Sequence, residues 1–328
     1  MENRSKNGRF SLYLSDESWI SNNARSGEVK LSSKIRVDKE VKDWKYLILG
    51  ISEDIGPQIN NGFEGAKNGF SSFVSAIQNV QSNDFIDGSE IGFLGEVIQN
   101  QNFESLENST GWVEELDDFV YETLQKYSFV SQTIIVIGGG HNNAYPLLRN
   151  SKTQFNKPVH AINIDPHADC RTTDFRHSGN PFSYAIKDGY LDKYSIVGLH
   201  ESYNNQFILD FIAENEIDAI YFEQFLDNEI AFWKTIDNIA SSVNHDNTYT
   251  LDLDLDSIAF CPSSARTPSG FTIEDCRKII RKLSSEIKFS YLHLPEGSPE
   301  TESEKRNYGK MLSYFVIDFI KCQNKLEK

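Results

Sequence analysis

Short runs of β-branched, aliphatic and aromatic residues recur along this chain, and they restrict its fold more than any other feature. Most runs are apolar at consecutive positions, as expected of strands buried on both faces. The predicted strands are Tyr46–Ile51, Thr133–Ile137, Val159–Ile164, Ser195–Leu199, Ala219–Phe222, Tyr249–Leu255 and Ser290–Leu294. The helix-length stretches between them include Gly65–Gln78, Trp112–Tyr127, Tyr203–Glu214 and Ile273–Ile287. Such alternation predicts an α/β fold in which a mainly parallel sheet lies between layers of helices.

The chain of 328 residues contains no internal repeat, low-complexity block or linker. This length suits one large α/β domain or two smaller ones, and the lack of a linker favours one. The first forty residues are polar and weakly periodic, as in Ser21–Asn23 and Ser32–Lys34. We therefore predict an irregular N-terminal arm over residues 1–40 and a single domain over residues 41–328.

The charge and the apolar runs exclude several classes of partner. Forty-eight acidic residues against 32 basic ones give a formal net charge of −16, which repels phosphate backbones and anionic lipids. No apolar run approaches the roughly 20 residues of a membrane span, and the first ten residues lack a secretory signal. The four cysteines have no CxxC spacing, which argues against a disulfide framework and a zinc ribbon. We expect a cytoplasmic protein that binds neither nucleic acid nor membrane.

One predicted strand ends in a glycine-rich turn, at the edge where open parallel sheets bind ligands. The strand Thr133–Ile137 continues into Gly138-Gly139-Gly140-His141, so the backbone can turn sharply before it presents an imidazole. A glycine-rich turn can also hold phosphate, but this one has neither the Walker lysine nor the GxGxxG spacing. A histidine that only occupies a tight turn is the simpler alternative.

Two other strands end in acidic residues at alternating positions. These are Asp165, His167 and Asp169 after Val159–Ile164, and Asp252, Asp254 and Asp256 in or after Tyr249–Leu255. With a period of two, each set points to one side of an extended segment. Such carboxylates repel each other in a low dielectric unless water or cations separate them. Together with His141 they offer about six carboxylate and imidazole ligands, which suits a pair of ions such as manganese, with zinc, nickel or iron as rivals. A solvated acidic strand is the alternative.

These motifs, in this order, resemble the ureohydrolase family, which includes arginase, agmatinase and formimidoylglutamase. The matching segments are Gly138–His141, Asp165–Asp169 and Leu253–Asp256, with weaker similarity at Glu53–Gly56 and Leu294–Glu296. The resemblance covers most of the chain after about residue 45. It implies a three-layer α/β/α sandwich, two Mn²⁺ ions per chain and hydrolysis of an amidine or guanidine C–N bond. It is also compatible with a homotrimer or homohexamer.

The resemblance also assigns the metal ligands. They are His141, Asp165, His167, Asp169, Asp254 and Asp256. In the third motif, Thr250 favours Asp252 as the first ligand, whereas Ile258 favours Asp254 and Asp256. We choose the later pair, because a ligand strand must return an apolar residue to the core after it leaves the metals. Asp252 then lies behind the ligands.

Two positions depart from the family pattern without removing a ligand. Gly140 stands where the family usually has Asp, and Pro166 stands where it usually has Ala. The segment after Asp256 is also about two residues shorter than usual before Pro262. We therefore expect the loop over the site to have its own shape.

Three residues match catalytic positions of the family. Asp169 would accept a hydrogen bond from the attacking water, and His177 would protonate the leaving amine. Glu296 would pair with the cationic amidinium of the substrate. A surface-loop histidine and a solvated glutamate are the corresponding alternatives for His177 and Glu296.

The substrate is indicated by Arg171 and the segment Ser178–Phe182. Formimidoylglutamase-like members usually carry Arg two positions after the last aspartate and a later Ser-Gly-x-Pro-Phe segment, whereas arginase-like and agmatinase-like members carry an uncharged residue there. Arg171 and Asn180 are therefore the predicted substrate-binding residues. A guanidinium suits a carboxylate, which formimidoylglutamate has twice and agmatine lacks. Arg171 could instead neutralise the acidic cluster as a structural ion pair.

The sequence thus predicts a dinuclear-metal hydrolase of a linear amidine. N-formimidoyl-L-glutamate, cleaved to formamide and glutamate in histidine degradation, is the first choice of substrate. An arginase, agmatinase or other guanidino-acid hydrolase is the alternative. A metal-binding paralogue that has lost catalysis is the third possibility, and the presence of all six ligands, His177 and Glu296 argues against it.

Overall fold

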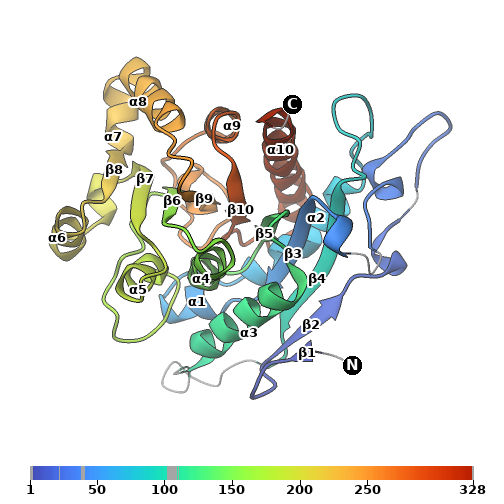
Figure 1. The fold of residues 1–328 in the computed structure, drawn as a ribbon, viewed down its shortest axis with the longest axis horizontal. Helices are drawn as coiled ribbons and strands as arrows, with labels where there is room; N and C mark the ends of the chain where they lie inside the picture. Colours follow the sequence, from blue (N-terminus) through green and yellow to red (C-terminus); the bar gives the residue numbers. More distant parts are fainter. Residues whose placement is uncertain (1–2, 22, 38–40, 102–108, 110, 327–328) are drawn as a thin grey trace.

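One ten-stranded sheet organises the part of the chain that the computed structural model describes, namely residues 3–21, 23–37, 41–101, 109 and 111–326 (Figure 1). Its strand order is β1-β2-β4-β3-β5-β10-β9-β6-β7-β8. The strands are β1 (Asn3–Arg4), β2 (Phe10–Leu14), β3 (Tyr46–Ser52), β4 (Ile91–Gln99), β5 (Thr133–Ile137), β6 (Val159–Ile164), β7 (Lys193–Leu199), β8 (Asp218–Tyr221), β9 (Thr248–Leu253) and β10 (Phe289–Leu294). All neighbours from β4 to β8 are parallel, whereas β1 and β2 are antiparallel.

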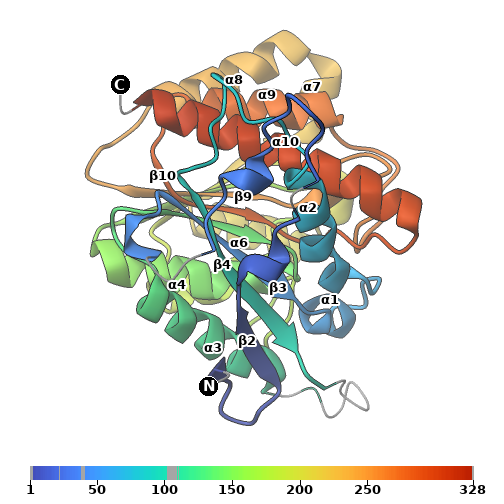
Figure 2. The ribbon, with the colours of Figure 1, turned by 90° about the vertical axis from the view of Figure 1, so that its right-hand side faces the viewer.

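Helices cover both faces of the sheet (Figure 2). One face packs against α2 (Gly69–Ile77), α7 (Phe222–Asp227), α8 (Glu229–Ser241), α9 (Ile273–Ser284) and α10 (Glu302–Leu326). The other face packs against α1 (Ile55–Ile59), α3 (Trp112–Tyr127), α4 (Ala144–Phe155), α5 (Pro181–Lys187) and α6 (Gln206–Glu214). Each face has its own cluster of fully buried apolar side chains. The predicted three-layer α/β/α sandwich with a mainly parallel sheet is confirmed.

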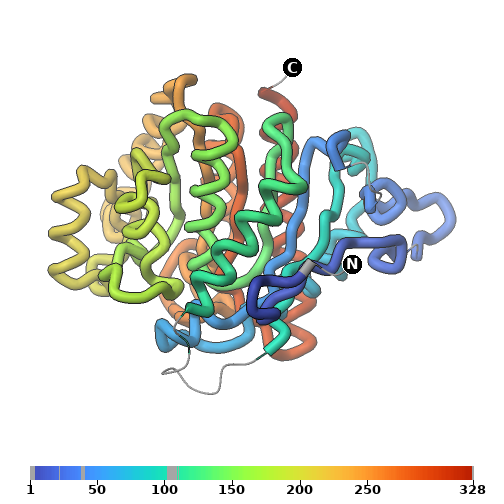
Figure 3. Tube along the Cα trace, turned by 60° about the horizontal axis from the view of Figure 1, so that its bottom comes forward, coloured from blue at the N-terminus to red at the C-terminus, as the bar shows by residue number. Residues whose placement is uncertain are grey.

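The chain enters the sheet at one edge, reaches the opposite edge at β8 and returns to the centre through β9 and β10 (Figure 3). The N-terminal strands lie at one end of the sheet, and β7 and β8 lie at the other. All seven strands predicted from the sequence are present. The strand β9 ends at Leu253 rather than Leu255, because the carboxylate of Asp254 accepts a hydrogen bond from the backbone of Asp256 at 2.7 Å and begins a 3₁₀ turn.

Strand β4 was not predicted from the sequence. Two glycines interrupt its apolar pattern, and both are required by close neighbours. A Cβ on Gly92 would lie 2.0 Å from the ring of Trp44, and one on Gly95 would lie 2.2 Å from the backbone oxygen of Tyr13. Glycine inside a strand often marks such an approach.

The prediction of an irregular arm over residues 1–40 is wrong at Phe10–Leu14, which forms β2 and pairs with β4. Phe10 and Leu12 are buried, and Phe10 meets Trp112 of α3 edge-on at 6.4 Å. Tyr13 on the same strand is 40% exposed. The strand β2 has only five residues, so its alternation of buried and exposed side chains is too short to be recognised in a polar region of the sequence.

Among the described helices, none combines the length and the apolar character that crossing a membrane requires.

Phe10→Ala tests whether β2 is part of the core. Removing a fully buried Phe should lower the free energy of unfolding by about 3–5 kcal/mol, whereas an irregular arm would tolerate the change. The measurement is chemical denaturation, and Tyr13→Ala on the exposed side of the same strand is the control. Equal, small effects of both substitutions would contradict the placement of β2.

Candidate metal centre

Four neighbouring strands at the centre of the sheet bring the predicted ligands to one edge. Their order is β5-β10-β9-β6, and all four are parallel, so their carboxyl ends lie together. His141 follows β5, the Asp165–Asp169 segment follows β6, Asp254 and Asp256 follow β9, and Glu296 follows β10. The topology thus assembles residues that are more than a hundred positions apart in the sequence.

His141 lies at the centre of the first group of ligands. Its Nδ1 is 2.9 Å from Asp169 Oδ2, 2.9 Å from Asp254 Oδ2 and 3.2 Å from Asp165 Oδ2. The imidazole is fully buried. Three carboxylate oxygens therefore converge on one ring nitrogen, which can carry a single proton.

His167 belongs to a second, adjoining group. Its Nδ1 is 3.5 Å from Asp165 Oδ1 and 3.9 Å from Asp256 Oδ2. The two oxygens of Asp165 thus face different histidines, His141 on one side and His167 on the other. A carboxylate in this position can serve two neighbouring ions.

The six residues fit a pair of divalent cations. Neither ring nitrogen of His141 makes a hydrogen bond of good geometry with any described residue, although three carboxylate oxygens lie within 3.2 Å. Burial, and then the charges of Asp165 and Asp256, raise the pKa of Asp254 well above its usual value. Burial and the neighbouring Asp165 also raise the pKa of Asp169. Hard or borderline divalent cations would reduce the repulsion between these buried carboxylates. They would also give the Nδ1 atom of His141 a cation to coordinate.

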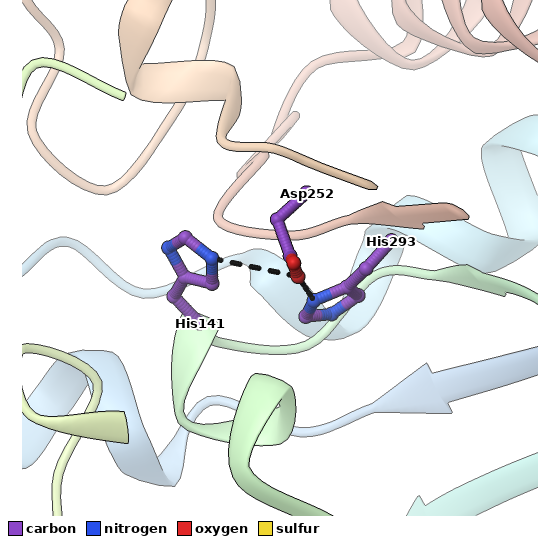
Figure 4. A group of neighbouring side chains, drawn as sticks. All are labelled: His141, Asp252 and His293. Carbon is purple, nitrogen blue, oxygen red and sulfur yellow. Dashed lines mark hydrogen bonds and ion pairs between the residues drawn. The ribbon is translucent and has the colours of Figure 1, made fainter. Parts of the chain in front are cut away.

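Asp252 lies behind the ligands, on β9, between two histidines (Figure 4). Its Oδ1 is 3.0 Å from His293 Nδ1 and 3.8 Å from His141 Nε2, and its Oδ2 accepts a hydrogen bond from the hydroxyl of Tyr291 at 2.9 Å. It therefore approaches the opposite ring nitrogen of His141 from the one that faces the other aspartates. This arrangement supports Asp254 and Asp256 as the ligands and gives Asp252 the task of orienting His141.

Glu296 closes the site from the β10 side. Its Oε1 accepts a hydrogen bond of 2.6 Å from the backbone of His141. Its Oε2 is buried and has no hydrogen-bond partner among the described residues. Burial and the nearby Asp256 raise the pKa of Glu296 to about 8. Glu296 is one of the residues that line the cavity, where a cationic group could pair with its carboxylate.

Glu53 was not singled out from the sequence, yet it fixes the His141 turn. Its Oε1 accepts hydrogen bonds from the backbone of Gly140 at 2.7 Å and from the side-chain amide of Asn143 at 2.8 Å. A Cβ on Gly140 would lie only 2.3 Å from Pro57, so the aspartate usual in the family cannot fit there. The sequence signal that could have identified Glu53 is its position directly after the buried strand β3.

A cavity of about 280 Å³ opens over the ligands. Of the residues predicted from the sequence, its wall contains His167, Asp169, Arg171, Asp254, Asp256 and Glu296. The side chain of Arg171 is exposed there, and among the described residues it forms no ion pair. This contradicts the alternative in which Arg171 neutralises the acidic cluster, and it leaves the guanidinium available to a ligand.

Two predicted site residues do not reach the cavity wall, His177 and Asn180. The amide of Asn180 is buried and fully used inside its own loop: Oδ1 accepts from Arg176 at 2.9 Å, and Nδ2 donates to the carbonyls of Thr172 and Phe175 at 3.0 and 2.8 Å. Asn180 therefore shapes the loop, and the prediction that it contacts substrate is not supported.

His177 is buried, and its Nδ1 accepts a hydrogen bond from the backbone of Gly179 at 3.0 Å. Burial and the positive charges of Arg171 and Arg176 lower the pKa of His177 to about 4. A neutral imidazole is a much weaker acid than an imidazolium and is poorly suited to protonate a leaving amine at pH 7. The arrangement thus does not favour the predicted role of general acid.

Tyr203 is a cavity residue that the sequence did not reveal. Its ring stacks on His167 with a centroid distance of 5.4 Å and on His200 with a centroid distance of 4.8 Å. Its hydroxyl lies 2.9 Å from the hydroxyl of Thr267. Tyr203 therefore fixes the plane of a candidate ligand. No local motif could signal this, because the contact depends on how the loop after β7 folds.

Residues 45–319 match the arginase family, and this chain belongs to that family. Its members are hydrolases built around a dinuclear metal centre. The resemblance seen in the sequence motifs is therefore confirmed.

Several formimidoylglutamases are among the proteins to which this chain is similar. The formimidoylglutamase of Macrococcus caseolyticus is 26% identical over 274 residues, which cover 82% of each chain. That of Staphylococcus carnosus is 25% identical over 298 residues, covering 89% of this chain and 90% of the relative. Among solved structures, the Mn²⁺ form of Trypanosoma cruzi formiminoglutamase aligns with a TM-score of 0.70 at 20% identity, covering 89% of this chain and 98% of that one. The structure of Bacillus subtilis formimidoylglutamase aligns with a TM-score of 0.74 at 13% identity, and the alignment covers 93% of this chain and 95% of that one.

Metal analysis of three variants tests the assignment of ligands. Asp165→Ala should lose both ions, because its two oxygens face both histidines, whereas Asp252→Asn should keep both and lower the rate about tenfold. Asp256→Asn should cost orders of magnitude in rate. The measurements are elemental analysis after manganese loading and initial rates. A larger loss for Asp252→Asn than for Asp256→Asn would select the earlier pair of aspartates instead.

Tyr203→Ala should weaken manganese binding next to His167 about 10- to 100-fold, the usual cost of removing a group that orients a ligand. Tyr203→Phe keeps the stacked ring and should retain two ions per chain, which makes it the matched control. Titration of the metal-free protein with Mn²⁺, followed by calorimetry, measures both. If Tyr203→Ala binds two ions as tightly as the wild type, stacking does not position His167.

Proposed function

We propose that this protein is a manganese-dependent hydrolase of N-formimidoyl-L-glutamate that releases formamide and L-glutamate. The observation that carries the proposal is the unpaired guanidinium of Arg171 in the wall of the cavity that also contains the carboxylates of Asp169, Asp254 and Asp256. A substrate with an amidine at one end and carboxylates at the other matches these opposite charges. The names of the relatives and of the aligned structures support the same choice.

The proposed metal ligands are His141, Asp165, His167, Asp169, Asp254 and Asp256. Two bound Mn²⁺ ions would supply the acidity that makes water a nucleophile near neutral pH. The protein then has to orient the amidine, hold the carboxylate end and move protons.

Glu296 is proposed to orient the amidine. Its Oε1 accepts a hydrogen bond from the backbone of His141 at 2.6 Å, its buried Oε2 has no hydrogen-bond partner among the described residues, and Glu296 lines the cavity. A planar amidinium pairs well with a fixed carboxylate, and this pairing would present its central carbon to the attacking water.

Asp169 is proposed to carry the proton. It lines the cavity, its backbone is in the left-handed region with φ of 47°, and its Oδ2 lies 2.9 Å from His141 Nδ1. It can accept a proton from the attacking water and pass it to the leaving nitrogen, which departs only after protonation. His177 was the first candidate for this step, but it is buried away from the cavity wall.

The same observations support the two alternative functions, hydrolysis of a guanidine substrate and metal binding without catalysis, less well. Agmatine carries no carboxylate, so an agmatinase would leave Arg171 without a partner in the site. An arginase substrate carries one carboxylate, so this reading remains the second candidate. A metal-binding paralogue without catalysis would keep the six converging residues, but it would require neither the cavity nor the buried Glu296 Oε2 that has no hydrogen-bond partner among the described residues.

The proposal is tested on the manganese-loaded protein with a panel of substrates. Formamide and glutamate should be released from N-formimidoyl-L-glutamate at least a hundredfold faster than urea is released from arginine or agmatine. A preference for either guanidine substrate would overturn the choice of substrate while leaving the class of reaction intact. Chelation should abolish all activity.

Arg171→Ala should raise KM for N-formimidoyl-L-glutamate about tenfold to a hundredfold, because it removes a charge-assisted contact worth roughly 1.5–3 kcal/mol. Manganese content should not change, since no ligand is altered. Arg266→Ala is the control: this arginine pairs with Glu300 at 2.5 Å on the surface. An unchanged KM for Arg171→Ala would remove the main support for a carboxylate-bearing substrate.

A further inference from the structure

Two of the proposed ligands, His167 and Asp169, lie beyond β6, which ends at Ile164. Their segment no longer belongs to a strand, yet Pro166 and Ala168 within it are buried. Buried backbone amides and carbonyls need hydrogen-bond partners. Groups outside the strands must therefore hold this segment in place.

The loop after β7 supplies these partners, mainly through the side chain of Asn204. Its Oδ1 accepts a hydrogen bond from the amide of Ala168 at 3.1 Å, and its Nδ2 donates to the carbonyl of Pro166 at 3.2 Å. Nδ2 also donates to the carbonyl of His200, in the same loop, at 2.8 Å. The amide of His200 donates to the carbonyl of Pro166 at 3.0 Å. The side chain of Asn204 thus holds the backbone on both sides of His167.

His167 depends on this support more than the other candidate histidine ligand does. Its side chain is 28% exposed, whereas that of His141 is fully buried. Close packing therefore restricts His167 less, apart from the ring of Tyr203 that stacks on it. Because peptide units are planar, fixing the carbonyl before His167 and the amide after it fixes the direction of its Cα–Cβ bond.

We propose that Asn204 is a positioning residue that holds His167 in the orientation in which its imidazole coordinates manganese. Asn204 lines the cavity, but it acts through the backbone of the ligand segment, so this role requires no contact with substrate. The proposal rests on the metal centre of the proposed function and is independent of which amidine is hydrolysed. Its readout is therefore the affinity for Mn²⁺ rather than turnover.

Asn204→Ala removes the acceptor of the Ala168 amide and one of the two donors to the carbonyl of Pro166. With its backbone released, His167 should bind its ion more weakly. We expect the dissociation constant of that Mn²⁺ to rise about 10- to 100-fold, the usual cost of losing a group that orients a ligand. The ion next to His141 should be affected much less. Calorimetric titration of the metal-free protein with Mn²⁺ measures both.

Asn205→Ala is the matched control. Asn205 is the next residue and lines the same cavity, but its Oδ1 caps α6 by accepting a hydrogen bond from the amide of Ile208 at 3.1 Å. Losing this cap should lower the Tm of the metal-free protein, while the affinity for Mn²⁺ stays that of the wild type. An effect of stability alone on metal binding would therefore appear in both variants.

A double variant tests whether Asn204 acts through His167. In His167→Ala the ligand is already absent, so adding Asn204→Ala should not weaken the remaining Mn²⁺ binding further. If the double variant binds Mn²⁺ more weakly than His167→Ala does, Asn204 acts on another group and the proposal is overturned.

The remaining outcomes separate this role from the proposed function. Wild-type affinity for both ions in Asn204→Ala overturns the role of Asn204, and so does an equal loss in Asn204→Ala and Asn205→Ala. If Asn204→Ala does not fold, Asn204→Ser replaces it, because its shorter side chain cannot reach both Ala168 and Pro166. A selective loss of affinity in that variant then supports the proposal, and wild-type affinity overturns it.

The wild type itself provides the last comparison. If it binds two ions but does not hydrolyse N-formimidoyl-L-glutamate, the proposed function is overturned and the role of Asn204 stands. If it binds no Mn²⁺, the metal centre is overturned, and the role of Asn204 with it.

Discussion

The mutual repulsion of buried carboxylates is the constraint on which the arrangement of this protein depends. Asp165, Asp169, Asp254 and Asp256 lie around two histidines at the carboxyl ends of β6 and β9, and burial raises the pKa of Asp169, Asp254 and Asp256. Divalent cations bound between these carboxylates would remove the electrostatic cost of keeping them charged. The surrounding groups serve the same end: Glu53 holds the His141 turn, Asp252 faces the far side of the imidazole, and Tyr203 supports His167.

The candidate ligands could be proposed from the sequence, and the structure brings them together, because their geometry is local. A period of two after a buried strand determines which side chains share a face, and parallel strands bring their carboxyl ends together. The choice between Asp252 and Asp256 as a metal ligand depended on which apolar residue packs into the core after the chain leaves the metal site. In the structure Ile258 is buried, and Asp256 faces His167.

The residues around the ligands could not be predicted in this way, because their positions depend on loop conformation. His177 and Asn180 match the family in sequence, yet a loop built around the Asn180 amide and the buried Arg176–Asp117 ion pair turns both away from the cavity wall. Asn204 and Tyr203 reach the site from a segment with no recognisable motif. The strands β2 and β4 were missed for different reasons. The strand β2 is too short to show a clear alternation of buried and exposed residues, and two closely packed glycines interrupt the apolar pattern of β4.

The position of β10 has a consequence for how the protein is made. This strand is the last in the sequence, but it is inserted between β5 and β9 at the centre of the sheet. During synthesis, β5 and β9 must therefore remain separated, or pair wrongly, until residues 289–294 have left the ribosome. Contacts of such long range are slow to form, and partly assembled parallel sheets expose strand edges that aggregate. Since β10 also delivers Glu296, a metal ion that binds earlier would meet an incomplete site, and a truncated chain should neither fold nor retain manganese.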